Sequence, residues 1–201
     1  MIVIVDYGMG NINSISNIIA KSGHKSLVTS KASEIRLATK IILPGVGSFD
    51  NGMQKLKELG LIDVLTIKAL EENIPILGIC LGMQLMTKNS QEGKLEGLGW
   101  IDALTVRFDQ DVTKIPHMGW NFIEQKKESV LFSEFYPDSR FYFMHSFFVK
   151  CNNIGDILTL TEYGKKFCSS FQKKNIYGVQ FHPEKSHKFG IKLFHNFICS
   201  A

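Results

Sequence analysis

The hydrophobic positions in the first half of the chain alternate between short apolar runs and helical spacing. The apolar runs occupy residues 2–5, 27–28, 41–43 and 74–79. After the first run, isoleucines recur at helical spacing: Ile12, Ile15, Ile18 and Ile19. Gly23 is a predicted helix stop, and residues 63–72 form a second helical pattern. This rhythm predicts a parallel sheet with crossover helices, in which residues 74–79 form a central strand covered on both faces.

The pattern changes after about residue 100 to shorter alternating runs with Gly, Asn, Asp and Lys between them. These runs are residues 101–108, 121–124, 141–149, 157–163, 167–172 and 176–181. They predict antiparallel strands and hairpins added to the α/β core. A last amphipathic helix has its apolar positions at Phe189, Leu193, Phe194, Phe197 and Ile198. We therefore expect an α/β fold with a mostly parallel central sheet, flanking helices and added antiparallel strands, in one domain over residues 1–201.

Composition narrows the class of protein. With 44% hydrophobic and 21% charged residues the chain has the composition of a globular protein, and no apolar run reaches the roughly 20 residues of a spanning helix. The first residues lead directly into a strand-like run rather than a signal peptide, so we expect a cytoplasmic protein without membrane partners. The formal charge of +4 is mild, and the lysine pairs lie in predicted turns, which argues against nucleic-acid binding.

Cysteine usage indicates reduced thiols. The four cysteines, Cys80, Cys151, Cys168 and Cys199, are scattered and form no Cys-x-x-Cys pair. This argues against a zinc site and against a secreted disulfide framework, and we expect neither metal nor cofactor. For most free cysteines the ordinary interpretation is a small buried hydrophobe, and we apply it to all but Cys80.

Cys80 is exceptional because it stands between two glycines where a strand pattern changes to a helix pattern. The segment Gly78-Ile-Cys-Leu-Gly82 follows the buried run and precedes the helical Met83-Gln84-Leu85-Met86. This is the strand-turn-helix elbow of serine hydrolases with a thiol in place of the hydroxyl. The glycines allow backbone to pass close to the nucleophile, and the helix start favours a thiolate.

A base for this thiol is predicted near the other end of the chain. Residues 176–181 read as a strand that ends on His182-Pro183-Glu184. A cysteine nucleophile needs an imidazole within hydrogen-bond reach and a third group that fixes the imidazole tautomer, a role that Glu184 can fill. Pro183 restricts how the two side chains are displayed. Alone, the three residues would more often be a polar strand end than a catalytic pair.

The two motifs together resemble the class I (triad) glutamine amidotransferases, over essentially the whole chain and with a flavodoxin-like fold. Four further segments are similar to one branch of that family, the glutaminase subunit of imidazole glycerol phosphate synthase in L-histidine biosynthesis. They are Asp6-Tyr-Gly-Met-Gly-Asn11, Pro44-Gly-Val-Gly47, Pro116-His-Met-Gly-Trp-Asn121 and Phe141-Tyr-Phe-Met-His-Ser146. The resemblance implies hydrolysis of glutamine to glutamate and ammonia through a Cys80 thioester, with His182 as acid and base and Glu184 as orienting group.

The resemblance also implies roles for residues around the triad. The oxyanion hole would use Leu81 with Gly45 and Val46, where flanking glycines allow a peptide plane to reorient; the alternative is a plain tight turn. Substrate-binding residues would be Gly47, Gln84, Glu92, His145 and Ser146, although Gln84 could instead face solvent, Glu92 lie in a polar loop and His145 be a core histidine. Interface residues would be Pro116, Trp120 and Asn121, with Trp120 as an anchor.

The implied partner is a (β/α)₈-barrel cyclase subunit that receives the ammonia in a heterodimer. Three other interpretations stay open. A paralogous subunit would supply ammonia to surface-sugar biosynthesis, a non-catalytic subunit would only regulate a barrel partner, and a cysteine peptidase of similar fold would cleave peptides. The acceptor substrate, the extent of activation by the partner and the conformation of the Gly45-Val46 loop are not determined by the sequence.

Overall fold

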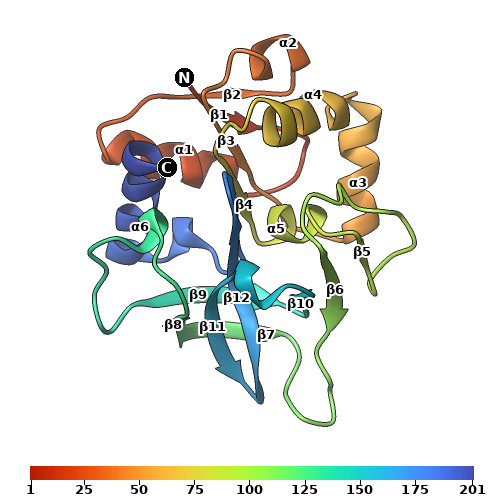
Figure 1. The fold of residues 1–201 in the computed structure, drawn as a ribbon, viewed down its shortest axis with the longest axis vertical. Coiled ribbons are helices and arrows are strands. Elements are labelled where there is room, and N and C mark those ends of the chain that lie inside the picture. The colour runs from red at the N-terminus through yellow and green to blue at the C-terminus, as the bar shows by residue number, and fades with distance from the viewer.

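The computed structural model describes residues 1–201 and is built on a large mixed sheet (Figure 1). Its main strand order is β2-β1-β3-β4-β13-β12-β10-β6-β5. Five adjacent strands pair in parallel: β2 (Ser26–Thr29), β1 (Ile2–Val5), β3 (Lys40–Leu43), β4 (Ile76–Ile79) and β13 (Ile176–Val179). The predicted mostly parallel core is confirmed. The last of these strands was expected to be antiparallel, but β13 pairs in parallel with β4.

Antiparallel strands extend this sheet beyond β13. They are β12 (Lys165–Lys173), β11 (Ile157–Tyr163), β10 (Phe147–Cys151) and β8 (Glu124–Gln125), with β6 (Ala103–Arg107) antiparallel to β10 and the short β5 (Asn89–Ser90) parallel to β6. A separate two-stranded antiparallel sheet pairs β7 (His117–Phe122) with β9 (Arg140–His145). The run 141–149, predicted as one strand, is therefore divided between two sheets, and the change occurs at Ser146.

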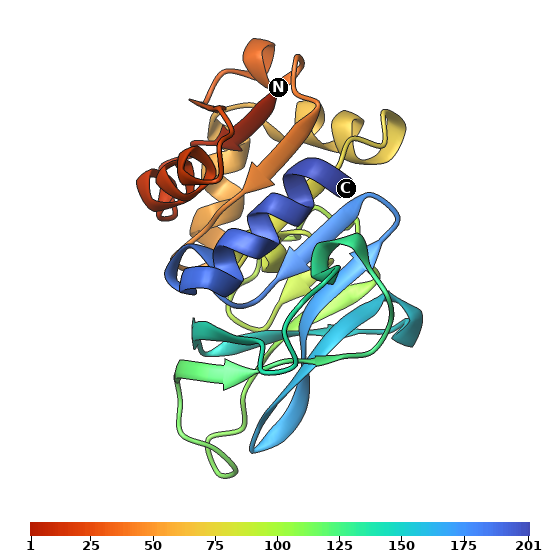
Figure 2. The same ribbon diagram turned by 90° about the vertical axis from the view of Figure 1, so that its left-hand side faces the viewer.

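Helices cover both faces of the parallel strands, as Figure 2 shows in the turned view. One face is covered by α1 (Ile12–Lys21) and α6 (His187–Ser200). The other carries α2 (Ala32–Ile35), α3 (Phe49–Glu58), α4 (Ile62–Thr66) and α5 (Leu81–Leu85). A π-helical turn (Ile67–Glu71) continues α4, and 3₁₀ turns occupy Val130–Phe132, Ile154–Asp156 and Pro183–Lys185. The sequence pattern had not predicted α2 or α3.

Alternate residues of the central strands point into two separate cores. Val3 and Val5 of β1 lie in the core beneath α3 and α4, whereas Ile2 and Ile4 lie in the core beneath α1 and α6. Strands buried on both faces carry near-continuous apolar sequence, which is why β1, β3 and β4 were recognisable. None of the helices combines the length and the apolar character that crossing a bilayer requires.

Strand register brings three distant segments to one edge of the sheet. Gly78 of β4 is paired with Leu43 of β3 and with Gly178 of β13. Because all three strands run in the same direction, the residues that follow them emerge side by side. In open α/β sheets, ligands bind outside the carboxyl ends of the strands. The loop after β3, Cys80 after β4 and the segment after β13 meet at this edge.

Candidate active site

Cys80 occupies a strained turn between β4 and α5. Its backbone has φ 54° and ψ −109°, in a region that residues with a side chain seldom adopt, and its N–H donates to the carbonyl of Val179 at 2.8 Å. Such a conformation costs of order 1–3 kcal/mol and persists only where the surrounding structure imposes it. The residue as a whole is 8% exposed. The predicted elbow is therefore present in its backbone geometry.

The two glycines of the elbow are required by backbone packing. A Cβ on Gly82 would lie 1.9 Å from the carbonyl oxygen of Leu43, and one on Gly78 would lie 2.8 Å from the backbone of Gly82. No backbone can yield that much without moving the turn. These two glycines let the start of α5 lie directly against β3 and β4.

His182 and Glu184 form a buried pair beside Cys80. Nδ1 of His182 lies 2.8 Å from Oε1 of Glu184, and their side chains are 2% and 1% exposed. The backbone of His182 is fixed on β9, because its N–H donates to the carbonyl of Tyr142 at 2.8 Å. Nε2 of His182 has no hydrogen-bond partner within the chain. That nitrogen is free to exchange a proton with a substrate or with the thiol.

Charge at the site favours a protonated imidazole. Burial alone would lower the pKa of His182, but the neighbouring Cys80 sulfur and the Glu184 carboxylate outweigh burial and raise that pKa from 6.5 to about 10. An imidazolium held by a carboxylate beside a thiol is the arrangement from which a cysteine nucleophile can attack a carbonyl carbon and then protonate a leaving amine.

A pocket of about 240 Å³ opens over Cys80 and contains nine of the fourteen residues expected at the site. Its lining is Val46, Gly47, Cys80, Leu81, Gln84, Glu92, Pro116, Met144, His145, Ser146 and Phe147. Pro116, expected at an interface, therefore borders the pocket. His182, Glu184, Gly45, Trp120 and Asn121 are the expected residues outside this lining.

The backbone donor expected for an oxyanion is occupied. The N–H of Leu81, directly after the nucleophile, donates to the carbonyl oxygen of Gly45 at 3.3 Å. The preceding carbonyl, of Pro44, accepts a hydrogen bond from the Tyr7 hydroxyl at 2.6 Å. In this conformation the loop after β3 presents a carbonyl, not an N–H, toward Leu81.

Comparison with known proteins decides the family. The model of the family "Glutamine amidotransferase class-I" matches residues 3–201. The chain belongs to this family. Its relatives at high identity share one description. The chain is 56% identical over 202 residues, covering 100% of both chains, to imidazole glycerol phosphate synthase subunit HisH 2 of Methanococcus maripaludis. It is 47% identical to the HisH 2 subunit of Pseudomonas aeruginosa, covering 98% of each chain.

Solved structures support the fold of this class I amidotransferase. A crystal structure described as a glutamine amidotransferase aligns with a TM-score of 0.74 at 18% identity, covering 98% of this chain and 96% of the other. The crystal structure of a glutamine amidotransferase from Thermotoga maritima aligns with a TM-score of 0.66 at 20% identity, covering 91% of this chain and 75% of the other. At these identities the likeness concerns the fold alone.

Gln180 is a polar residue of the amidotransferase site that the sequence did not single out. It is fully buried, and its Nε2 lies 3.7 Å from the sulfur of Cys80. Its Oε1 accepts a hydrogen bond from Nε2 of Gln84 at 3.1 Å. The register of two parallel strands could have indicated it. Ile79 of β4 is paired with Val179 of β13, so Gln180 and Cys80, the next residues, lie side by side.

Gln84 faces inward rather than toward solvent. It is 5% exposed, and its Nε2 also donates to the carbonyl of Phe147 at 3.1 Å. Both hydrogen bonds use the amide nitrogen of Gln84. Neither uses its carbonyl oxygen, and Gln84 lines the pocket.

His145 belongs to a fixed chain of neutral side chains. Its Nδ1 donates to the carbonyl of Phe147 at 2.7 Å, so its Nε2 must accept from Nδ1 of His117 at 3.0 Å, and Nε2 of His117 accepts from Asn121 at 3.2 Å. Burial lowers the pKa of His145 to about 3 and that of His117 to about 4. The core-histidine alternative thus describes part of its role, although His145 also borders the pocket.

Glu92 combines two roles in the same way. Its Oε2 accepts the N–H of Phe49 at 2.9 Å, at the start of α3, and its side chain borders the pocket. Burial, followed by the neighbouring charge of Asp50, raises the pKa of Glu92. The carboxylate therefore links the unpredicted helix α3 to the pocket wall of the amidotransferase.

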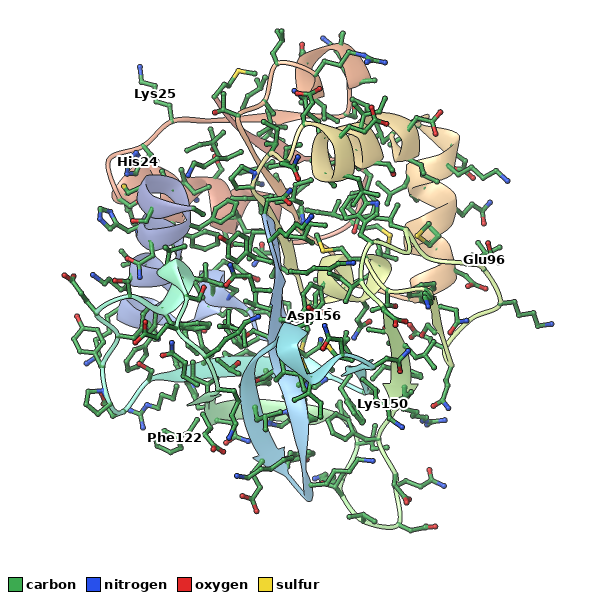
Figure 3. All side chains as sticks on the ribbon, viewed as in Figure 1. His24, Lys25, Glu96, Phe122, Lys150 and Asp156 are labelled. Atoms are coloured by element: carbon green, nitrogen blue, oxygen red, sulfur yellow. The ribbon has the colours of Figure 1, made fainter.

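The outer face of β7 carries an apolar stripe next to the pocket. Met118 is 62% exposed, Trp120 43% and Phe122 57%. Figure 3 shows Phe122 at the edge of the molecule. Trp120 stacks on His187 with an interplanar angle of 4° and has the Arg140 guanidinium over its ring. Alternation along a strand puts these three side chains on the same face, away from His117 and Asn121.

Proposed function

We propose that this chain, as one domain, is the glutaminase subunit of imidazole glycerol phosphate synthase and hydrolyses L-glutamine to glutamate and ammonia in histidine biosynthesis. The observation that carries the proposal is the buried His182–Glu184 pair, 2.8 Å apart, beside the Cys80 elbow. The relatives support it, because a chain 56% identical over its full length bears that subunit's name. Family membership supports the proposed reaction, and the local geometry supports the residues assigned to it.

Cys80 and His182 divide the chemistry between them. The sulfur of Cys80 attacks the side-chain amide carbon of glutamine, and Nε2 of His182 gives its proton to the departing nitrogen, which leaves as ammonia. A γ-glutamyl thioester remains. Nε2, now unprotonated, takes a proton from water, the resulting hydroxide attacks the thioester, and glutamate leaves as the thiolate is restored. Glu184 holds Nδ1 throughout and stabilises the imidazolium.

The oxyanion of each tetrahedral intermediate needs donors that the resting loop does not offer. Rotation of the peptide plane between Gly45 and Val46 would release the N–H of Leu81 and turn the N–H of Val46 toward the same point. Two donors would then converge on the developing charge. Val46 is 41% exposed, so its own side chain does not oppose this rotation. Glutamine cleavage would thus wait for a signal that favours the rotated loop.

The substrate would lie in the pocket over Cys80. Gly47 and Ser146 form part of its wall, and the Gln84 carbonyl oxygen and the Glu92 carboxylate are acceptors for the ammonium end of glutamine. A carboxylate near a bound ammonium gives a charge-assisted hydrogen bond. The neutral His145 holds the Phe147 carbonyl, and both residues line the pocket.

Ammonia is useful only if it reaches an acceptor before it is protonated or lost. We therefore place a (β/α)₈-barrel cyclase subunit over the pocket in a heterodimer. The apolar stripe Met118, Trp120 and Phe122, next to Pro116 at the pocket rim, supports this docking surface. Exposed aromatic residues are frequent interface anchors.

The test is glutamate release from glutamine, measured with and without the co-purified cyclase and its acceptor ligand. The Cys80→Ala chain should release no glutamate while the complex still uses added ammonia for synthesis. Full glutaminase activity in Cys80→Ala would exclude this mechanism. Absence of glutaminase activity in the wild-type complex would favour a purely regulatory subunit.

The pathway needs its own experiment, because several relatives bear numbered names, HisH 1 or HisH 2. The alternative acceptor is a barrel-like enzyme of surface-sugar biosynthesis. Rescue of a histidine auxotroph that lacks this subunit, with the matching cyclase supplied, decides for histidine synthesis. Failure to rescue by a chain with intact glutaminase activity decides for the alternative.

A further inference from the structure

Three side chains with metal-binding atoms converge at a surface site that the glutaminase chemistry does not use. Sγ of Cys199 lies 3.6 Å from Nε2 of His24 and 3.8 Å from Nδ1 of His195. All three ligand atoms lie within 4.8 Å of one another. His24 follows α1 in the chain, whereas the other two residues belong to α6. Figure 3 labels His24 beside the C-terminal helix.

The arrangement has the dimensions of a tetrahedral metal site. Bond lengths of about 2.3 Å from Zn²⁺ to sulfur and about 2.0 Å to imidazole nitrogen place sulfur and nitrogen about 3.5 Å apart in a tetrahedron. The two sulfur–nitrogen distances found here are 3.6 and 3.8 Å. His195 and Cys199 are four positions apart on one helix, which puts both side chains on the same face. The sulfur of Cys199 therefore lies at a suitable distance from each imidazole nitrogen, and the two nitrogens lie within 4.8 Å of each other.

We propose that His24, His195 and Cys199 form a binding site for a transition-metal ion of the Zn²⁺ type. One thiolate and two imidazoles match the ligand preferences of Zn²⁺, whereas Mg²⁺ and Ca²⁺ prefer oxygen. Cys199 and His195 are exposed and His24 is partly exposed, so an ion can reach all three. Three protein ligands leave a fourth position for water.

A bound ion would tie the end of α6 to the turn after α1. These helices already pack against each other, but His24 and Cys199 are 175 positions apart in the chain. A link between such distant segments opposes their separation and therefore stabilises the folded chain by mass action. The sequence-based argument against zinc considered only closely spaced cysteines, and it could not see ligands that helix packing brings together.

The experiment uses the full chain with Cys80→Ala, so that the catalytic thiol cannot compete for metal. Co²⁺ is titrated under reducing, anaerobic conditions, because a thiolate bound to Co²⁺ gives a near-ultraviolet charge-transfer band and tetrahedral coordination gives visible bands. We expect one Co²⁺ per chain, displaced by Zn²⁺, and a rise in melting temperature with Zn²⁺. Cys199→Ser should lose the charge-transfer band, and His24→Ala and His195→Ala should each weaken Zn²⁺ binding at least about tenfold.

Matched controls in the same Cys80→Ala chain are Cys151→Ser, a partly buried thiol, and His187→Ala, an exposed histidine at the other end of α6. Both should keep the band and the affinity. Metal-free Cys199→Ser should melt as its parent does, because its side chain is exposed. Retention of the band in Cys199→Ser, its loss in Cys151→Ser, or no Co²⁺ binding by the parent chain would each overturn the proposal.

Discussion

The N–H of Leu81 donates a hydrogen bond to the carbonyl oxygen of Gly45 at 3.3 Å, directly beside the nucleophile. The Gly45–Val46 peptide should donate to an oxyanion together with the N–H of Leu81. In the resting loop its carbonyl instead accepts that same N–H. Gly45 cannot carry a side chain, since a Cβ there would lie 2.6 Å from the Tyr7 hydroxyl and 2.8 Å from the backbone of Gly82. The hydrogen bond from Tyr7 to the Pro44 carbonyl holds the base of the loop, so that rotation is confined to the peptide that follows.

Val46→Pro tests whether that rotation is needed. Proline has no N–H. The resting loop does not use the N–H of Val46, so it is unaffected, but the rotated loop can no longer supply this N–H as the second donor to the oxyanion. We expect glutaminase activity in the complex with the cyclase to fall by about 10²–10³-fold, the effect of removing one oxyanion donor. Ammonia-dependent synthesis by the same complex should be unchanged.

Val46→Ala is the control for this substitution, because it removes the exposed side chain and keeps the N–H. It should retain activity within about threefold of wild type, since surface substitutions are usually nearly neutral. Equal activities for the proline and alanine variants would show that Val46 donates nothing to the intermediate.

Gln180→Leu tests the amide beside the sulfur. Its Nε2 is the donor nearest to Cys80, at 3.7 Å, and a hydrogen bond to a charged group contributes about 1.5–3 kcal/mol. We expect alkylation of Cys80 by iodoacetamide to slow by about tenfold near pH 7, with a similar loss of glutaminase kcat. Gln84 keeps the Phe147 carbonyl as the acceptor of one N–H, whereas its second N–H loses the acceptor that Gln180 provides.

Gln180→Glu places a carboxylate against the thiolate and should slow alkylation further than leucine does, because like charges repel at short range. Gln172→Leu, on the partly exposed part of β12, is the matched control and should behave as wild type. If leucine and glutamate at position 180 leave the pH profile of alkylation unchanged, Gln180 has only a packing role.

The raised pKa of His182 predicts a defined loss of stability at alkaline pH. The value rises from 6.5 to about 10 on folding, so the protonated imidazole stabilises the folded chain fully below pH 6.5. That contribution decreases as the pH rises toward 10 and is absent above it. Glu184→Gln removes a carboxylate that opposes the effect of burial on His182. The pKa of His182 is therefore lower in this variant, and its contribution to stability is lost completely at a lower pH.

The measurement is the free energy of unfolding, from denaturant titrations at several values between about pH 6 and 10. Wild type should show the steeper decline over this interval. Cys80→Ala should resemble Glu184→Gln in direction, because it also removes a charge that favours imidazolium. Parallel profiles for all three chains would contradict the assigned pKa and its causes.

The parallel core was predictable because burial on both faces forces continuous apolar runs. The strands β1, β3 and β4 were recognised for this reason, and so was helix α6 with its aromatic stripe. Helix α3 was missed because its segment, Phe49–Glu58, contains a central glycine and has few apolar residues. The division of residues 141–149 was also missed, since nothing local marks Ser146 as the point where the chain passes from one sheet to the other.

In the candidate site, too, local motifs could be predicted from the sequence, whereas contacts between distant segments could not. Cys80, His182 and Glu184 were predicted from local motifs and from the family resemblance. Gln180 and Tyr7 act through contacts with segments far away in sequence, and no periodicity reports such contacts. The state of the Gly45–Val46 peptide depends on a single torsional choice that glycine leaves open. Sequence can show that this choice exists, and the structure shows which option is taken.

Gly82→Ala tests whether the elbow depends on backbone contact. A Cβ at this position would lie 1.9 Å from the carbonyl oxygen of Leu43, so α5 must move away from β3. We expect the free energy of unfolding to fall by about 3 kcal/mol or more, at the upper end for overpacking, which lowers the melting temperature by about 6–12 °C in a chain of this size.

Gly23→Ala is the control for this substitution. Its φ of +86° is unfavourable, but an added Cβ meets no atom within 4 Å, so the free energy of unfolding should fall by about 1–2 kcal/mol. Because a shift of α5 also moves the N–H of Leu81 relative to Cys80, Gly82→Ala should lose glutaminase activity even at temperatures where it stays folded, whereas Gly23→Ala should keep it. Equal melting temperatures and equal activities for the two variants would mean that the close approach of α5 to β3 does not hold the nucleophile in place.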